Sequence, residues 1–422
     1  MQYVWQYRLI HSVKLVTVDG LRVEVINPGM LNRDAGPDFF NADIKIDGQQ
    51  WAGNIEFHVR ASDWYRHKHD KDPAYDSVIL HVVEHDDSPV FRSNGEKIPQ
   101  MELKCARDLN VHYAALTNMA TTSLSCSIHL PSIPSIYITD WILALAHQRL
   151  QQKVEALTTI ADTLNGDWDS ASYIFMSRAL GFGKNTDPFE RLARATPLPF
   201  LRKHADNTSA IEAILFGQAG FIPDDTKDND YAATLQRDYL FYRSKFNLAP
   251  PQQLQWKFSR MHPQNFPYRR IAYLAAIISG GLLYPERFHE DDTLESIRQR
   301  LTIDLKGYWS NHYSFGGNPS PYPIQMSRAS LDLIIINAIV PLLYAWGIKH
   351  KEQWRIDKAI DLMSELKPEN NSLVRMFTDR GIKCPDALTS QGLIQLRRTY
   401  CEQRKCLMCR IGHRILTLAA IR

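Results

Sequence analysis

The chain has 422 residues, 44% of them apolar, and a formal net charge of +3. This length and composition are typical of a globular protein with two sizeable hydrophobic cores, and so small a net charge does not by itself indicate a nucleic-acid partner. No basic leader runs into an unbroken apolar stretch, and the longest apolar run, 331–346, contains Asp332 and Asn337. We therefore expect a cytoplasmic protein without a membrane span. No Walker-type or dinucleotide-binding fingerprint is present, which leaves an ATPase or a dehydrogenase without support.

Alternation of polar and apolar residues predicts strands in the first part of the chain, as far as about Leu103. Asp47-Gly48 predicts a hairpin turn between two of them, and Ser93-Asn94-Gly95 predicts a second turn. The expected strands are 13–26, 42–46, 51–59, 77–83, 90–91 and 100–103.

Two carboxylates flank the first hairpin. Asp38 follows Pro37 just before one strand, and Glu56 lies in the middle of the returning strand, so the two can converge on one ion. Glu56 and His58 are two residues apart and face the same side of a strand. A Mg²⁺ or Mn²⁺ ion held by Asp38 and Glu56 would suit phosphodiester hydrolysis, and His58 could position or activate the water.

At these residues the sequence resembles the restriction-endonuclease-like superfamily, whose motif is Pro-Asp, a gap, Asp or Glu, one residue, and Lys. The resemblance implies a mixed-sheet nuclease domain. His58 stands where the family has its lysine, so the fixed positive charge of the motif is missing. Lys45 on the neighbouring strand, or Lys104, could supply it. An ordinary turn beside a solvated strand face is the structural alternative.

Histidines are concentrated near this motif. Five of the fifteen, at positions 58, 67, 69, 81 and 85, fall within 28 residues, with Asp63, Asp70 and Asp72 between them. Asp63, His67 and His69 could line a substrate groove. A rival interpretation is a zinc or manganese site made by His67, His69 and Asp63 or Asp70, although two histidines two apart face one way only in an extended segment. A solvated histidine-rich loop is the third interpretation.

A change of period indicates a second domain. The stretch 123–134 is rich in Ser and Pro, and from Asp140 onward a 3.6-residue period predicts helices. We expect a nuclease-like domain over 1–125, a linker over 126–139 and a helical domain over 140–422. The expected helices are 141–164, 169–181, 187–195, 208–219, 231–245, 268–283, 292–303, 328–346, 354–365 and 388–400.

Arg269 and Arg270 open one of these helices after a loop fixed by Pro263 and Pro267. At a helix start, arginines and unpaired backbone amides can together bind a phosphate, so both are candidates for substrate binding. The alternative is a pair of salt bridges to acidic residues of the first domain.

The last 48 residues are basic and rich in cysteine. From Arg375 onward there are ten Lys or Arg residues and three acidic residues. Such a basic segment could neutralise the backbone phosphates of a nucleic acid, or it could be an ordinary solvated helix face. Four of the six cysteines lie in this tail, at 384, 401, 406 and 409. They predict zinc or an iron–sulfur cluster held by four cysteines, or by three cysteines with His413; buried thiols on an apolar helix are the alternative. Cys105 and Cys126 are isolated in sequence and are interpreted as structural.

Several longer segments resemble a bacterial family of the domain of unknown function 2851 type, which spans nearly the whole chain. The resemblance implies one two-domain protein and no particular activity. The matching segments are 32–39 (NRDAGPDF), 62–64 (SDW) with His67 and His69, 78–83 (VILHVV), 212–220 (EAILFGQAG), 262–272 (HPQNFPYRRIA), 400–401 (YC) and 406–412 (CLMCRIG).

The expected protein is therefore of the α+β class, with a mixed-sheet restriction-endonuclease-like domain followed by an all-α domain and a basic cysteine-bearing tail. The expected activity is metal-dependent cleavage of nucleic acid. Two alternatives stay open: a non-catalytic nucleic-acid or protein-binding protein on the same fold, and a His/Asp metallohydrolase acting on a small substrate.

Overall fold

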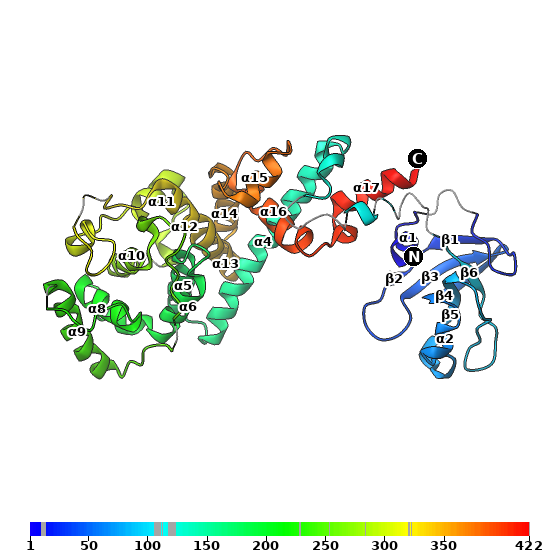
Figure 1. Cartoon of the computed structure of the whole chain (residues 1–422), viewed down its shortest axis with the longest axis horizontal. Coiled ribbons are helices and arrows are strands. Elements are labelled where there is room, and N and C mark those ends of the chain that lie inside the picture. The colour runs from blue at the N-terminus through cyan, green and yellow to red at the C-terminus, as the bar shows by residue number, and fades with distance from the viewer. Residues whose placement is uncertain are drawn as a thin grey trace. The chain divides into compact units, whose positions relative to one another are not determined.

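The computed structural model describes residues 1–9, 14–104, 111, 113–116, 124–227, 229–252, 254–282, 284–319, 321 and 323–421. Contacts divide the chain into two compact units (Figure 1). The sheet unit consists of Met1–Trp141 together with Arg397–Arg422, and the helical unit is Ile142–Leu396. The α+β class is thus confirmed, with a mixed sheet towards the amino terminus and helices after it.

In the described part of the sheet unit, six strands form one mixed sheet in the order β1-β3-β4-β5-β6, with β2 paired to β3. The β1–β3, β2–β3 and β3–β4 pairs are antiparallel, whereas β4–β5 and β5–β6 are parallel. The strands are β1 (Val23–Asn27), β2 (Met30–Leu31), β3 (Phe39–Ile46), β4 (Gln49–Arg60), β5 (Val78–His85) and β6 (Gln100–Glu102).

The hairpin between β3 and β4 forms where Asp47-Gly48 predicts it. Both residues have positive φ, 49° and 83°, and Ile46 pairs with Gln49 directly across the turn. Backbone twist of this kind matches that of the two strands, so Asp-Gly fixes the register. That register sets the faces of β4: Phe57 packs edge-on against Trp5 of helix α1 (Gln2–Gln6) on one side, and Glu56 and His58 point to the other.

Helix α2 (Asp63–Arg66) and two short 3-10 turns, His69–Lys71 and Pro73–Tyr75, connect β4 to β5. Trp64 of α2 is fully buried and packs with Tyr75, Val78, Val90 and Ile98. Its indole nitrogen donates to the Phe91 carbonyl at 3.1 Å, which fixes the ring beneath the connector. The connector between β4 and β5 is therefore anchored by a buried hydrophobic cluster around Trp64.

Most of the described helices of the remaining chain lie close to the predicted positions, but those over 198–202, 372–378 and 410–421 were not predicted. The series begins with α4 (Ser135–Thr163), which ends at Asn165-Gly166, both with positive φ as at a helix stop. The others are α5 (Trp168–Leu180), α6 (Thr186–Ala195), α7 (Leu198–Arg202), α8 (Thr208–Gln218), α9 (Asp230–Phe246), α10 (Pro267–Ser279), α11 (Leu294–Leu301), α12 (Arg328–Ile334), α13 (Val340–His350), α14 (Gln353–Glu365), α15 (Ser372–Thr378), α16 (Ala387–Gln395) and α17 (Arg410–Ile421).

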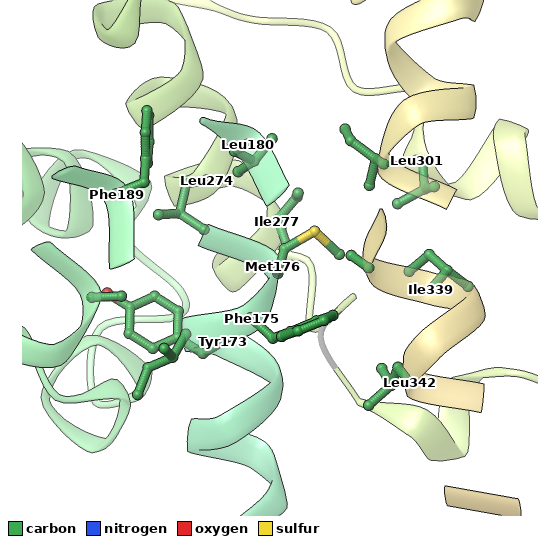
Figure 2. Close-up of a cluster of buried hydrophobic side chains, with 14 of the residues drawn as sticks. Tyr173, Phe175, Met176, Leu180, Phe189, Leu274, Ile277, Leu301, Ile339 and Leu342 are labelled. Carbon is green, nitrogen blue, oxygen red and sulfur yellow. The ribbon is translucent and has the colours of Figure 1, made fainter. Parts of the chain in front are cut away.

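The core of the helical unit forms where α5 meets α10, α11 and α13. Figure 2 shows Phe175 and Met176 of α5 among Ile277, Leu301 and Leu342, all of them buried. Every turn of α5 contributes apolar side chains, because this helix is covered on most of its circumference. Such all-round burial is typical of a central helix.

One continuous helical stretch, Arg328–His350, is long and apolar enough to cross a membrane by length and composition. Of its most apolar 18-residue window, 67% is buried inside the structure. Leu331, Ile335 and Leu343 belong to the core of the helical unit, so this helix has the burial of a core helix. A π-helical turn, Ile335–Ile339, interrupts it between α12 and α13.

The compact units divide the chain differently from the sequence-based domains. Residues 397–422, which the sequence assigns to the helical domain, are part of the sheet unit. The division at the other end lies at Trp141, within α4, and the expected 126–139 linker contains a 3-10 turn, Ser127–Ser132, and the start of α4. Of the expected strand 13–26, residues 10–13 lie outside the described part of the chain, and the regular strand begins at Val23.

Candidate metal centre

Asp38 and Glu56 meet at the β3–β4 pair, as expected from the hairpin. The backbone amide of Asp38 donates to Glu56 Oε2 at 3.0 Å, and the amide of Phe57 donates to Asp38 Oδ2 at the same distance. Glu56 is 6% exposed. The Glu56 carboxylate is thus held by the backbone just before β3, and the Asp38 carboxylate by the backbone of β4, while Glu56 Oε1 makes neither bond.

Glu56 Oε1 faces the histidines. It lies 3.7 Å from His58 Nε2 and 3.7 Å from His69 Nε2. One ring nitrogen each of His58, His67 and His69 lies within 4.8 Å of the others, so three imidazoles converge, and Glu56 Oε1 lies beside two of them. Nitrogen and oxygen donors converging in this way are a donor set that suits a divalent transition-metal ion.

A chain of ring contacts fixes His58. Its Nδ1 is 2.8 Å from His81 Nε2, and its Nε2 is 3.0 Å from His67 Nδ1. His81 lies on β5 opposite Glu56 and is fully buried. With the His58 Nδ1 proton donated to His81, the lone pair of His58 Nε2 is directed toward His67, His69 and Glu56.

His67 and His69 reach the same point because the chain turns sharply between them. Lys68 has φ 65° and ψ 28°, the left-handed conformation that non-glycine residues rarely adopt. His69 is buried and stacks on Tyr75 with ring centroids 3.7 Å apart, whereas His67 is exposed. The expectation that residues two apart must be extended to face one way was therefore wrong here, and the surface ring of His67 marks the open side of the cluster.

The pKa values of four buried groups in the cluster are shifted toward the neutral form of each group. Burial, and secondly the charge of Asp38, raise the pKa of Glu56 to about 8, and burial raises the pKa of Asp38. Burial together with the neighbouring histidines lowers the pKa of His58 to about 4, and burial lowers that of His81 to about 3. His58 and His81 are therefore neutral, and neutral imidazole is the form that ligates metals.

The other candidates near the motif are placed differently. Lys45 lies opposite Gln50 on β4, six residues before Glu56, or roughly 20 Å along the strand. Lys104 is exposed and pairs with Glu102. The hairpin register thus keeps Lys45 away from the carboxylates, and neither lysine supplies the cation missing from the motif.

The aspartates of the connector serve its own fold. Asp63 Oδ2 accepts from the Arg60 amide at 3.2 Å, and its other oxygen pairs with Arg66 at 2.9 Å. Asp72 caps the turn that begins at Pro73. Asp63 is therefore engaged locally, and Asp70 is not among the groups that converge on the histidines.

Arg269 and Arg270, the candidate phosphate ligands, lie at the start of α10 and are 4% and 2% exposed. Arg269 donates to the Pro323 carbonyl at 2.6 Å, and Arg270 donates to Asn265 and lies over the Phe182 ring. In the described part of the chain their hydrogen-bond partners are neutral, and one nitrogen on each, Arg269 Nη1 and Arg270 Nε, has none. Burial lowers the pKa of Arg270 to about 9.

The four cysteines of the tail are divided between the two compact units. Cys384 belongs to the helical unit, where its thiol lies near Asp386 and Glu369, whereas Cys401, Cys406 and Cys409 are in the sheet unit. Burial, and after it the charges of Cys409, Cys126 and Cys406, raise the pKa of the Cys401 thiol. The metal site of Cys384, Cys401, Cys406 and Cys409 stays a prediction. Cys126, interpreted from the sequence as isolated, acts on the pKa of Cys401, and Cys105 lies outside the described residues.

Sequence reasoning gave His81 and Cys126 no role in a site. His81 lies within the apolar run 78–83, and a single histidine among apolar residues is the only sign in the sequence that it could belong to a site. Cys126 is far from the other cysteines in sequence, and only folding brings it near them.

The comparisons with known proteins give a family and no activity. The model of one family, described as "Protein of unknown function (DUF2851)", matches residues 1–372. The match spans the whole histidine and carboxylate cluster and ends before the three cysteines of the tail. No curated protein and no solved structure matches the chain.

Proposed function

We propose that this chain, which belongs to the family described as "Protein of unknown function (DUF2851)", is a divalent-metal-dependent nuclease that hydrolyses phosphodiester bonds of nucleic acid. The observation that carries the proposal is the convergence of Glu56 Oε1 with His58 and His69, at 3.7 Å from each ring, beside Asp38. Titratable groups of opposite type, buried together and open on one side, are typical of a catalytic centre.

The order of the strands supports the nuclease interpretation. Asp38 precedes β3, Glu56 lies in antiparallel β4, and β5 follows the connector parallel to β4. The resemblance to the restriction-endonuclease-like superfamily implies this sequence of elements. We include in the proposal that this sheet has the restriction-endonuclease-like fold.

The residues fit a metal ion, and they favour one of the two expected ions. Carboxylate oxygens suit both Mg²⁺ and Mn²⁺, but imidazole nitrogens suit transition metals better than Mg²⁺. Glu56, His58, His67 and His69 would hold Mn²⁺, with Asp38 beside them. Bound there, the ion would stabilise negative charge on the phosphoryl oxygens and lower the pKa of a water molecule.

The chain's own groups supply the rest. His81 orients His58 through the 2.8 Å ring contact, so His58 acts as a ligand and does not replace the charge of the missing lysine. Arg60, Lys68 and Lys71 are exposed beside the cluster and could bind the flanking phosphates of a nucleic acid. The exposed ring of His67 lies on the side from which substrate would enter.

The three imidazoles also favour a second candidate, a zinc or manganese hydrolase acting on a small substrate. A non-catalytic binding protein on the same fold is the third. Cleavage that disappears with Glu56 supports the nuclease. Nucleic-acid affinity without cleavage supports the binding protein, and zinc retained after loss of Glu56 but not of His67 and His69 supports the small-substrate hydrolase.

The experiment is cleavage of single- and double-stranded DNA and RNA by the full-length protein with Mn²⁺, Mg²⁺ or chelator. Asp38→Asn and Glu56→Gln are compared with the control Asp43→Asn. Asp43 lies on β3 outside the cluster, and its carboxylate accepts hydrogen bonds from Gln50. We expect both site variants to lose about 100-fold or more of the activity and the control to keep it. No cleavage by the unaltered protein with any substrate and ion would refute the proposal.

A further inference from the structure

A pocket lies in the helical unit at the start of α10, beside the 3-10 turn Pro263–Asn265 and the beginning of α12. It contains about 320 Å³ of space, which includes open solvent. Its polar lining includes Asn265, Arg269, Arg270, Gln325, Ser327 and Ser330. Among the described residues that line it, two are cationic and none is acidic, so the pocket carries an excess of positive charge.

The two arginines of this pocket are buried without a countercharge. In the described part of the chain they donate to a backbone carbonyl, a side-chain amide, a thioether and a hydroxyl, all of them neutral. Arg269 Nη1 and Arg270 Nε are buried and have no acceptor. Although burial lowers the pKa of Arg270 to about 9, its guanidinium is still charged at neutral pH. A buried charge of this kind is costly unless an opposite charge or further hydrogen bonds compensate it.

The nearby carboxylates are directed elsewhere. Asp332 of α12 pairs with Arg298 at 2.7 Å. Asp304 is exposed and accepts a hydrogen bond from the Gln325 side chain at 2.7 Å. The charge that would balance Arg269 and Arg270 therefore has to come from a ligand.

Two further kinds of donor belong to the same pocket. The N-cap of α10 is Phe266, whose side chain makes no capping hydrogen bond, so the backbone amides of the first turn of this 13-residue helix are left without a side-chain cap. Ser330 Oγ accepts from Arg270 at 3.3 Å and from Ser327 at 3.1 Å. Its own hydroxyl proton is thereby left to donate to a further acceptor.

We propose that this pocket binds a phosphate group, either inorganic phosphate or the phosphate of a monoester, with Arg269 and Arg270 as its charged ligands. A phosphate dianion balances two guanidinium groups, whereas a carboxylate carries only one charge. Its several oxygens can accept from arginines, a hydroxyl and helix amides at once. The site lies wholly within the helical unit, so the proposal does not depend on the metal centre or on nuclease activity.

The test is calorimetric titration of the full-length protein, without added divalent metal, with inorganic phosphate, adenosine monophosphate, adenosine and acetate. We expect both phosphate compounds to bind, and adenosine and acetate to bind at least about 10-fold more weakly. The tighter of the two phosphate compounds distinguishes a site for free phosphate from one for a phosphate ester. Binding of neither, or binding of acetate as tightly as phosphate, would overturn the proposal.

Variants assign the binding to the pocket. Arg270→Met should weaken phosphate binding about 100-fold, and Ser330→Ala, which removes one neutral donor, about 2- to 10-fold. The control is Arg328→Met, because Arg328 is an exposed arginine of α12 that pairs with Glu295 at 3.0 Å. The control should bind phosphate as the unaltered protein does. Equal binding by Arg270→Met and the unaltered protein would contradict the assignment.

A second measurement covers variants that fail to fold. Hydrogen exchange of the unaltered protein is compared in phosphate and in chloride at the same pH and ionic strength, with mass spectrometry of its peptides. We expect phosphate to slow exchange in peptides that cover 264–273 and 325–330, and to leave those of β3, β4 and β5 unchanged. Equal exchange of the pocket peptides in the two salts would refute the site.

Discussion

Glu56 accepts a hydrogen bond from the backbone amide of Asp38, and Asp38 accepts one from the amide of Phe57, the residue after Glu56, at 3.0 Å in both cases. This reciprocal arrangement leaves Glu56 Oε1 directed at His58 and His69. The carboxylates are consequently positioned before any ion or substrate binds. Preorganised groups of this kind need little rearrangement during a reaction.

Replacement of His81 should weaken the centre without removing a direct ligand. His81→Phe keeps an aromatic ring in a fully buried position but loses the 2.8 Å contact with His58 Nδ1. We expect Mn²⁺ affinity to fall about 10- to 100-fold, since the orientation of His58 is no longer fixed. Calorimetric titration with Mn²⁺ measures this, with His85→Phe, an exposed histidine of the same strand, as the control. Equal affinities of His81→Phe and the unaltered protein would show that His81 does not position His58.

The backbone at Lys68 should govern the relative placement of His67 and His69. Lys68→Gly removes the cost of its left-handed conformation, whereas Lys68→Val raises it by about 1–2 kcal/mol. We expect the glycine variant to bind Mn²⁺ as the unaltered protein does and the valine variant to bind more weakly. Both variants lose the same charge, so a difference between them reports on the backbone. Identical binding by the two would contradict this role for the turn.

Glu212 should make the stability of the helical unit depend on pH. Burial raises its pKa to about 7, and its carboxyl group accepts from the Tyr231 hydroxyl at 2.9 Å. Because the folded-state pKa lies above the unfolded one, the stabilisation is complete below about pH 4.5 and is lost as the pH rises through 7.

Glu212→Gln stays neutral at every pH and can still accept that hydrogen bond. We expect its stability relative to the unaltered protein to rise between pH 5 and pH 8 by at most about 3 kcal/mol. Denaturant unfolding at both pH values, with the exposed Glu365→Gln as the control, measures the change. A constant difference at the two pH values would rule out this ionisation.

If Arg270 binds phosphate, added phosphate should stabilise the folded protein, and this effect should depend on Arg270. Its buried guanidinium has neutral partners among the described residues, and Arg270→Met removes an uncompensated charge at similar volume, so it should fold at least as stably without anions. Phosphate at about 100 times its dissociation constant should stabilise the unaltered protein by about 2.7 kcal/mol and leave the variant unchanged. Thermal unfolding with and without phosphate tests this, with exposed Arg375→Met as the control. Equal stabilisation of both proteins would exclude Arg270 as the phosphate ligand.

The sequence predicted those parts of the site that depend on short-range periodicity. Asp47-Gly48 fixed the hairpin, and the two-residue period placed Glu56 and His58 on one face. Lys45 was a reasonable candidate for the missing cation only while the register was unknown, since pairing with Gln50 places it far from Glu56. Register depends on the turn and on the whole pattern of pairing, so one residue type cannot reveal it.

The remaining parts depend on long-range packing. The left-handed Lys68 aligns His67 with His69, yet nothing in a lysine indicates positive φ. His81 is recognised as a partner of His58 only through the parallel pairing of β4 with β5. Cys126 was interpreted as isolated, because its neighbours come from the other end of the chain.

The sheet unit is assembled from both ends of the sequence, with Ile142–Leu396 inserted between its two parts. During synthesis on the ribosome, the inserted helices are complete before Arg397 is made. The helical unit can therefore reach its folded state first, while the sheet unit waits for its last segment. A nascent chain that stops early would release a finished helical unit attached to an unfinished sheet unit.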